Sequence, residues 1–194
     1  SFHALRKTRL AAGETVAIFG AGGLGMSAIQ LAQAMGALDV YAVDINAGRL
    51  AQAATYGAIP VDATQDDPLA AIRRLTGGKG VDVALELIGL PETMRQAVQS
   101  LAVFGRAGLV GIAEKPFEID SYPELLGREA EVIGCADHLL HELPLLLEFA
   151  RRGLLDLSQV VTDTVPLEAD AINDVLDTLE QFGGRVRTVI TPEG

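Results

Sequence analysis

Cysteine, tryptophan and positive charge are scarce in this chain. Its 194 residues include one cysteine, Cys135, and no tryptophan. A single cysteine excludes an internal disulfide framework. Lysine and arginine number 15 against 26 aspartates and glutamates, which gives a formal net charge of −11. Nucleic acids and anionic membranes require a basic face on their partner, so this charge balance argues against binding to either.

Long apolar runs are also missing. No segment approaches the roughly 20 apolar residues of a membrane-spanning helix. Residues 1–10 are mixed and basic, without the apolar stretch of a secretory signal peptide. We therefore expect a cytoplasmic protein. The chain starts at Ser1, which is compatible with the loss of an N-terminal part.

Aliphatic residues are what the chain has in abundance. Hydrophobic residues make up 49% of it but aromatic residues only 5%, a composition common where helices pack on parallel strands. Apolar runs alternate along the chain with segments of helical periodicity. Expected strands cover residues 15–19, 40–43, 59–61, 81–88, 107–112, 132–135 and 187–191. Expected helices cover residues 24–35, 49–56, 66–75, 91–101, 122–126, 142–152 and 168–182. The pattern predicts an α/β fold, a doubly wound six-stranded parallel sheet (Rossmann fold) with a short C-terminal strand/helix extension.

A glycine motif follows the first expected strand. Gly20-Ala21-Gly22-Gly23-Leu24-Gly25 fits G-x-G-x-x-G, and Asp44 ends the second strand 19 positions after Gly25. In this context Gly20 allows the tight turn, Gly22 lets a pyrophosphate approach the backbone, and Gly25 lets the helix pack on the sheet. The helix N-terminus would hold the diphosphate. Asp44 would accept hydrogen bonds from the adenosine ribose and repel a 2′-phosphate, which favours NAD over NADP.

Other interpretations of this motif stay open. The glycines also suit a turn in an α/β protein that binds no ligand, and Asp44 also suits a solvated strand end. Class I methyltransferases place an acidic residue after the second strand of a related sheet, where it serves S-adenosylmethionine. The full glycine pattern favours a dinucleotide over that ligand.

Further segments resemble one known family. Together with Gly20–Gly25, the segments 77–83, 86–94, 110–112, 143–149 and 185–187 are similar, in collinear order, to the cofactor domain of medium-chain zinc-containing alcohol dehydrogenases. The resemblance implies that Gly22, Gly23 and Leu24 lie under the pyrophosphate and nicotinamide ribose. It implies a cofactor-binding set of Gly20, Gly22, Gly23, Leu24, Gly25, Asp44, Arg49, Ile88, Val110, Ile112, Cys135 and Arg187.

The resemblance also implies a role for each remaining member of the set. Arg49 would flank the adenosine ribose, and Ile88 would pack against adenine or its ribose. Val110 and Ile112 would lie beside the nicotinamide, with backbone groups near Val110 and Cys135 bonding its carboxamide. Arg187 would reach a phosphate. The alternative for Ile88, Val110 and Ile112 is ordinary core, and for Arg49 and Arg187 a solvated charge.

Residues for the family's catalytic zinc are not apparent in this chain. The resemblance implies that most zinc ligands come from a preceding domain, and the last from just upstream of the segment 1–5. Cys135, His3, His138 and His141 are the chain's own candidates, and we expect no metal site from them. His138 and His141 are three residues apart and suit solvated positions. No catalytic residue is assigned; Glu86 is expected to cap a helix or touch ligand.

The resemblance therefore implies the NAD-binding domain of a zinc-dependent alcohol dehydrogenase. Such an enzyme oxidises a primary or secondary alcohol or polyol to an aldehyde or ketone by hydride transfer to NAD; the fragment alone would bind cofactor without activity. Residues 1–12 would be a linker helix from the missing catalytic domain, 13–155 the NAD-binding domain, and 156–194 a helix and strand returning toward the missing part.

Partners and alternatives follow from the same interpretation. The expected partners are the missing N-terminal domain, a small alcohol, and possible pairing into a homodimer through the edge strand 132–135. Loss of a domain would leave an apolar patch around Ile112 and residues 187–190. The alternatives are a stand-alone dinucleotide-binding sensor and, less favoured, an S-adenosylmethionine-dependent methyltransferase.

Overall fold

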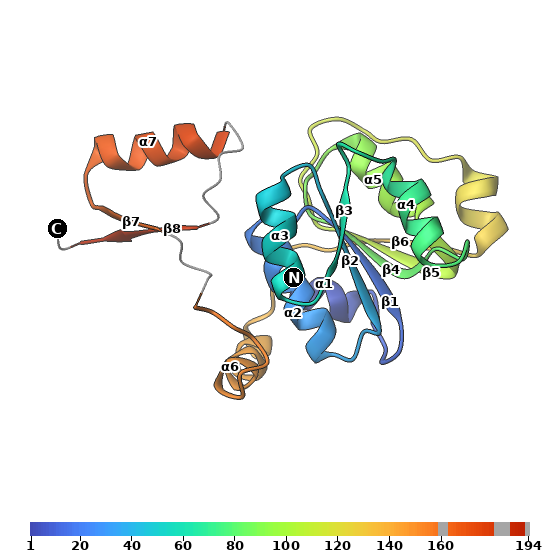
Figure 1. The fold of residues 1–194 in the computed structure, drawn as a ribbon, viewed down its shortest axis with the longest axis horizontal. Helices are drawn as coiled ribbons and strands as arrows, with labels where there is room; N and C mark the ends of the chain where they lie inside the picture. Colours follow the sequence, from blue (N-terminus) through green and yellow to red (C-terminus); the bar gives the residue numbers. More distant parts are fainter. Residues whose placement is uncertain (159–162, 181–186, 193–194) are drawn as a thin grey trace. The chain divides into compact units, whose positions relative to one another are not determined.

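The computed structural model describes residues 1–158, 163–180 and 187–192. The chain divides into two units, Ser1–Leu155 and Asp156–Gly194 (Figure 1). In the first unit, six strands form one parallel sheet in the order β3-β2-β1-β4-β5-β6. The strands are β1 (Thr15–Phe19), β2 (Asp39–Asp44), β3 (Ile59–Asp62), β4 (Val81–Glu86), β5 (Leu101–Leu109) and β6 (Glu131–Gly134). The predicted doubly wound fold is thereby confirmed.

Helices cover both faces of this sheet. The core on one face is lined by α1 (Phe2–Lys7), α2 (Gly23–Ala34), α3 (Ala47–Thr55) and α6 (Leu143–Arg151). The core on the other face is lined by α4 (Pro68–Leu75) and α5 (Pro91–Gln99). Figure 1 shows α2 and α3 on one side of the sheet and α4 and α5 on the other. Each apolar helix face therefore has a sheet face to cover it.

Strand β1 explains why the sequence reads as a continuous apolar run. Val16 and Ile18 belong to the first core, whereas Ala17 and Phe19 belong to the second. Successive side chains of a strand point to opposite faces. A central strand with both faces covered must therefore be apolar at every position.

Two strands end earlier than the sequence suggests. β4 ends at Glu86 and β5 at Leu109, so Ile88, Val110 and Ile112 lie in loops. The backbone amides of Val110 and Gly111 both donate to the carbonyl of Glu86, at 2.9 and 3.1 Å. Two successive amides on one carbonyl turn the chain out of the sheet, although its side chains remain apolar.

Three smaller differences concern element bounds. β5 begins at Leu101, six residues before the expected start at 107. The short helix expected at 122–126 is a π-helical turn, Ser121–Leu125, followed by a 3-10 turn, Leu126–Arg128. A 3-10 turn, Leu140–Glu142, precedes α6.

The second unit is small. α7 (Ala169–Glu180) connects two parallel strands, β7 (Asp163–Pro166) and β8 (Thr188–Thr191). The sequence did not indicate β7, whose four residues include a proline. The expected helix end at Phe182 lies outside the described residues. In the described part of the chain, every helix is too short or too polar to cross a membrane.

Candidate cofactor site

The glycine motif forms the turn between β1 and α2, at the carboxyl edge of the sheet. Gly20 has φ of +99°, a conformation that side chains disfavour, and its amide donates to the carbonyl of Val43 at 2.8 Å. A Cβ on Gly25 would lie 2.0 Å from the Gly20 carbonyl oxygen. The first turn of α2 therefore packs directly on the strand end, as the motif predicted for Gly25.

The middle of the motif is open. A Cβ on Gly22 would meet no atom within 4 Å. Gly22 is also the N-cap of α2, and no side chain caps this helix start. The first amides of a helix have no acceptor inside it, and the helix dipole adds positive potential there. These bare amides beside an open approach fit a diphosphate group.

Asp44 lies at the end of β2 and reaches back to this turn. Its side chain is nearly buried, with 7% of the residue exposed. Oδ2 accepts a hydrogen bond from the Ala21 amide at 2.7 Å, and Oδ1 accepts one from the Asn46 amide at 2.9 Å. The solvated strand end considered from the sequence is therefore wrong. Asp44 is held within the turn, and each oxygen retains lone pairs for a further donor.

Arg49 accompanies Asp44 from the neighbouring helix. Asn46 caps α3 by accepting a hydrogen bond from the Arg49 amide at 3.0 Å. The Arg49 Nη1 atom lies 4.0 Å from Asp44 Oδ2, with 19% of its side chain exposed. The structure thus brings Arg49 to Asp44 rather than leaving it as a solvated charge.

The three apolar candidates differ in exposure. Val110 packs against the first core, whereas Ile88 is 40% exposed and Ile112 is 92% exposed. Of the three, only Val110 packs against the core, and it is only partly buried. Ile88 also lies against the glycine turn, because a Cβ on Gly20 would lie 2.8 Å from its Cγ1. Ile88 and Ile112 present apolar surface at the sheet edge that carries the glycine motif.

Cys135 directly follows β6 at the same edge. Its amide donates to the Leu109 carbonyl at 2.8 Å, and burial raises the pKa of its thiol. The amides of Cys135 and Val110 are both occupied within the fold. Only other backbone groups near these residues, such as carbonyl oxygens, could therefore bond a carboxamide at this position.

Glu86 was given no definite role from the sequence, yet it is the most buried charged residue near the site. Its exposure is 0%, and Oε1 accepts hydrogen bonds from the Ile88 amide, the Gly89 amide and the Thr93 hydroxyl at 2.8–2.9 Å. Of the two possibilities considered, its side chain binds the turn before α5. The available signal was an acidic residue within the otherwise apolar segment 83–88.

No three histidine, cysteine, aspartate or glutamate side chains gather to hold a metal ion among the residues that the structure describes. His138 pairs with the adjacent Asp137, and His3 with Glu142. The described residues do not fit a zinc ion. Arg187 precedes β8 in the second unit and is exposed, so its approach to a phosphate stays a prediction.

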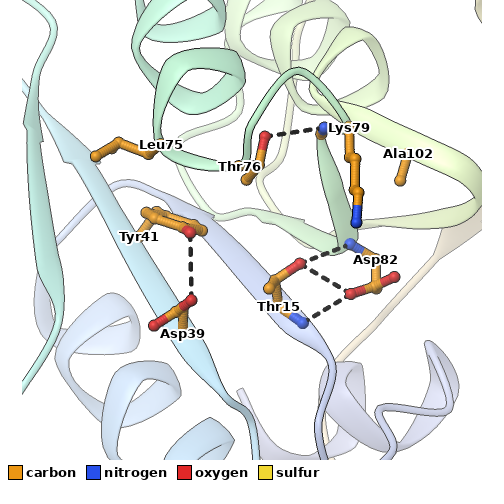
Figure 2. Close-up of a pocket in the computed structure, with 9 residues that line it drawn as sticks. Thr15, Asp39, Tyr41, Leu75, Thr76, Lys79, Asp82 and Ala102 are labelled. Atoms are coloured by element: carbon orange, nitrogen blue, oxygen red, sulfur yellow. Dashed lines mark hydrogen bonds between the residues drawn. The ribbon is translucent and has the colours of Figure 1, made fainter.

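A cavity of about 380 Å³ lies near the opposite, amino-terminal edge of the sheet (Figure 2). Asp82 Oδ2 accepts hydrogen bonds from both the amide and the hydroxyl of Thr15, each at 2.8 Å. The Tyr41 hydroxyl donates to Asp39 at 3.5 Å. Burial, followed by the charge of Asp39, raises the pKa of Tyr41. The acidic side chains here accept hydrogen bonds from neighbouring residues. The cavity is separate from the glycine motif, which lies at the other end of the strands.

Comparison with known proteins places these features in a family. A family model described as "Zinc-binding dehydrogenase" matches residues 23–152. The (R,R)-butanediol dehydrogenase of Bacillus subtilis is 34% identical over 193 residues, which cover 99% of this chain and 55% of that protein. An NAD-dependent alcohol dehydrogenase of Sulfurisphaera tokodaii is 30% identical, with 99% and 54% covered.

Solved structures agree with this result. The crystal structure of 2R,3R-butanediol dehydrogenase from Bacillus subtilis has a TM-score of 0.89 at 33% identity, covering 99% of this chain and 55% of that one. The alcohol dehydrogenase of Aeropyrum pernix has a TM-score of 0.86 at 32% identity, with 98% and 54% covered. The chain spans about half the length of the curated relatives it matches.

Proposed function

This chain belongs to the zinc-binding dehydrogenase family, and on that premise we propose that it is the NAD-binding part of an NAD-dependent alcohol dehydrogenase. The whole enzyme would oxidise a primary or secondary alcohol or polyol to an aldehyde or ketone. Within it, residues 13–155 would bind NAD, 1–12 would link to a preceding catalytic domain, and 156–194 would return toward that domain.

One observation carries the proposal: the open glycine turn at the uncapped start of α2. No atom lies within 4 Å of the Cβ position of Gly22, and no side chain satisfies the helix start. A glycine turn that served folding alone would be expected to fill this space or cap these amides. The geometry suits a ligand that brings negatively charged oxygens to the backbone.

The chain's own residues would bind and orient the cofactor, which when bound supplies the hydride acceptor. The turn at Gly22 and Gly23 would hold the diphosphate. Asp44 would accept hydrogen bonds from the adenosine ribose with the lone pairs that its backbone contacts leave. Ile88 would pack on the adenosine side, and Val110 and Ile112 beside the nicotinamide. Carbonyl oxygens near Val110 and Cys135 would accept hydrogen bonds from the carboxamide NH₂ group.

The carboxylate of Asp44 supports NAD over NADP. It lies 4.0 Å from Arg49, but both of its oxygens also accept backbone hydrogen bonds that fix their position. A 2′-phosphate at this place would bring a second negative charge against an immobile carboxylate. The proposed cofactor is therefore NAD.

A preceding domain is proposed as the partner that supplies the catalytic zinc. The 92% exposure of Ile112 in the first unit supports a missing contact, as do the exposed Val189 and Ile190 in the second. A small alcohol would bind mostly in that domain. β6 is an edge strand with Val132 exposed, which supports pairing into a homodimer through residues 132–135. A cytoplasmic location stays a prediction from the sequence.

Isothermal titration of the chain with NAD⁺, NADP⁺ and S-adenosylmethionine tests the cofactor assignment. The proposal expects NAD⁺ to bind with higher affinity than NADP⁺ and no heat from S-adenosylmethionine. Binding of S-adenosylmethionine alone would establish the methyltransferase alternative. Equal affinity for the two dinucleotides would refute the NAD preference. For the whole enzyme, zinc-ligand cysteines and histidines encoded upstream favour the dehydrogenase, whereas their absence favours a stand-alone dinucleotide sensor.

A further inference from the structure

Glu86 carries a buried charge that the fold only half satisfies. Its Oε1 atom accepts three hydrogen bonds, from the amides of Ile88 and Gly89 and from the hydroxyl of Thr93. Its Oε2 atom is equally buried but has no hydrogen-bond partner among the described residues. Donors to Oε1 stabilise negative charge on the group. An unpartnered carboxylate oxygen in the interior is nevertheless costly.

No cation compensates this charge within the described residues, because none of their ion pairs includes Glu86. The other buried glutamates differ in this respect. Glu124 pairs with Arg95, and Glu142 pairs with His3 and Arg6. Burial without a cation makes the field of Glu86 weakly screened by solvent or countercharge.

The free oxygen faces the loop 110–112. A Cβ on Gly111 would lie 2.7 Å from Oε2 and 2.1 Å from the Gly89 amide nitrogen. The main-chain carbonyl of Glu86 also accepts hydrogen bonds from the Val110 and Gly111 amides. Glu86 thus lies directly behind the residues that would contact the nicotinamide.

We propose that Glu86 selects the charge state of the cofactor, favouring the oxidised over the reduced nicotinamide. This inference rests on the proposed function, in which Val110 and Ile112 lie beside that ring. The oxidised ring carries a positive charge that the reduced ring lacks. A fixed negative charge behind the loop therefore attracts NAD⁺ more than NADH, without touching either. Glu86 acts as a specificity-determining residue through the field and through the loop that it positions.

The size of the effect follows from Coulomb's law. For any two unit charges about 10 Å apart at an effective dielectric constant of about 20, the interaction changes an equilibrium constant by roughly tenfold. Salt and nearby solvent reduce this value. Removal of the charge is therefore expected to change the ratio of NAD⁺ to NADH affinity by about three- to tenfold.

The test is calorimetric titration of wild type, Glu86→Gln and Glu86→Asp with NAD⁺ and with NADH. Glu86→Gln keeps the shape and an oxygen to accept the three hydrogen bonds, but removes the charge. It is expected to weaken NAD⁺ relative to NADH by about three- to tenfold. Glu86→Asp keeps the charge and disturbs the geometry, so it is expected to weaken both ligands alike. Glu124→Gln is the control for loss of another buried carboxylate and is expected to leave the ratio unchanged.

Each outcome bears on the inference. An unchanged ratio of NAD⁺ to NADH affinity in Glu86→Gln would overturn charge selection, whether both affinities equal those of wild type or both fall by the same factor. Glu86 would then have a purely structural role. A change of about three- to tenfold in the ratio of NAD⁺ to NADH affinity in Glu86→Asp, which keeps the charge, would also overturn it. This variant keeps the inference testable if Glu86→Gln does not fold. Failure of wild type to bind either dinucleotide would instead refute the proposed function.

Discussion

The carboxylate of Asp44 holds the backbone of Ala21, with Oδ2 accepting the Ala21 amide at 2.7 Å. This hydrogen bond joins the end of β2 to the middle of the glycine turn. The residue that would read the ribose therefore also fixes the loop that would hold the diphosphate. Substitutions at Asp44 act on both, and the choice of substituent separates the two effects.

Asp44→Asn is expected to relax discrimination against NADP⁺ while preserving the turn. The amide oxygen of asparagine can still accept the Ala21 amide. The negative charge is lost, and the side-chain NH₂ group replaces the oxygen that accepts the Asn46 amide. The affinity ratio of NADP⁺ to NAD⁺ should rise by about tenfold in calorimetry, because a 2′-phosphate no longer meets a carboxylate. Asp44→Gly should raise the affinity ratio of NADP⁺ to NAD⁺ too, and lower stability by about 1–3 kcal/mol through the two lost hydrogen bonds.

Asp39→Asn provides the matched control for Asp44→Asn. It removes one negative charge at the opposite end of β2. Its ratio of NADP⁺ to NAD⁺ affinity should equal that of wild type. If Asp44→Asn and Asp44→Gly both retain the wild-type ratio, Asp44 does not select the cofactor.

Gly22→Val is expected to abolish dinucleotide binding without unfolding the chain. Gly22 has φ of −75° and no atom within 4 Å of its Cβ position, so valine meets neither strain at φ nor a clash. Its side chain would occupy the space before the α2 amides. Affinity for NAD⁺ should fall below detection in calorimetry, while the free energy of unfolding changes by no more than about 1 kcal/mol. Retained binding would refute the assignment of the diphosphate to this turn.

Gly25→Ala, in contrast to Gly22→Val, is expected to lower the stability of the fold. An added methyl would lie 2.0 Å from the Gly20 carbonyl oxygen, so α2 must move away from the strand end. Urea denaturation should show a loss of about 2–3 kcal/mol, in the range of overpacked sites. Gly134→Ala is the control, because a Cβ there meets nothing within 4 Å. A Gly25→Ala protein as stable as this control would show that the close packing is not required.

The sequence was most informative where one local pattern fixed the structure. The glycine motif placed the β1–α2 turn and the packing role of Gly25 correctly, because turn and helix start depend on neighbouring residues. The alternation of strands and helices likewise predicted the parallel sheet. Strand ends were harder to predict. Ile88, Val110 and Ile112 continue an apolar run past the points where β4 and β5 end, and exposed and buried isoleucines are identical in a sequence.

Specific side-chain hydrogen bonds account for what the sequence could not show. The hydrogen bond between Asp44 and Ala21 joins residues 23 positions apart. From the sequence, Asp44 was expected to bind a ligand or to lie at a solvated strand end. The Glu86 side chain accepts hydrogen bonds from the amides of the following turn and from the hydroxyl of Thr93, seven residues later. Neither arrangement has a periodic signature, because each depends on the path that the chain takes after a strand ends.

The pair of Glu142 with His3 is expected to make stability depend on pH. Burial by itself raises the pKa of Glu142, but hydrogen bonds from His3 and the Leu139 amide, together with the charges of His3 and Arg6, lower it overall. A carboxyl with a lowered folded pKa stabilises the fold above its unfolded pKa, near 4.3, and this contribution is lost as pH falls through the folded value.

Glu142→Gln measures this contribution. At neutral pH the free energy of unfolding of the variant should be about 1–3 kcal/mol lower than that of wild type. The difference should shrink as pH falls below about 4, as followed by urea denaturation at each pH. Glu114→Gln, at an exposed glutamate of the chain, is the control for loss of one charge. A pH-independent difference for Glu142→Gln would contradict this account.

Cys135 is expected to be an unreactive thiol despite its place at the cofactor edge. Burial raises its pKa, and the opposing charge of Lys7 has a smaller effect. The thiolate is the nucleophile, so a raised pKa and 7% exposure both slow the reaction. Labelling with iodoacetamide near pH 7.5 should be at least about 100-fold slower in the folded chain than in urea, and saturating NAD⁺ should not accelerate it. Labelling at the rate of the unfolded chain would show an accessible thiolate, and a nucleophilic role at the proposed nicotinamide site would then have to be reconsidered.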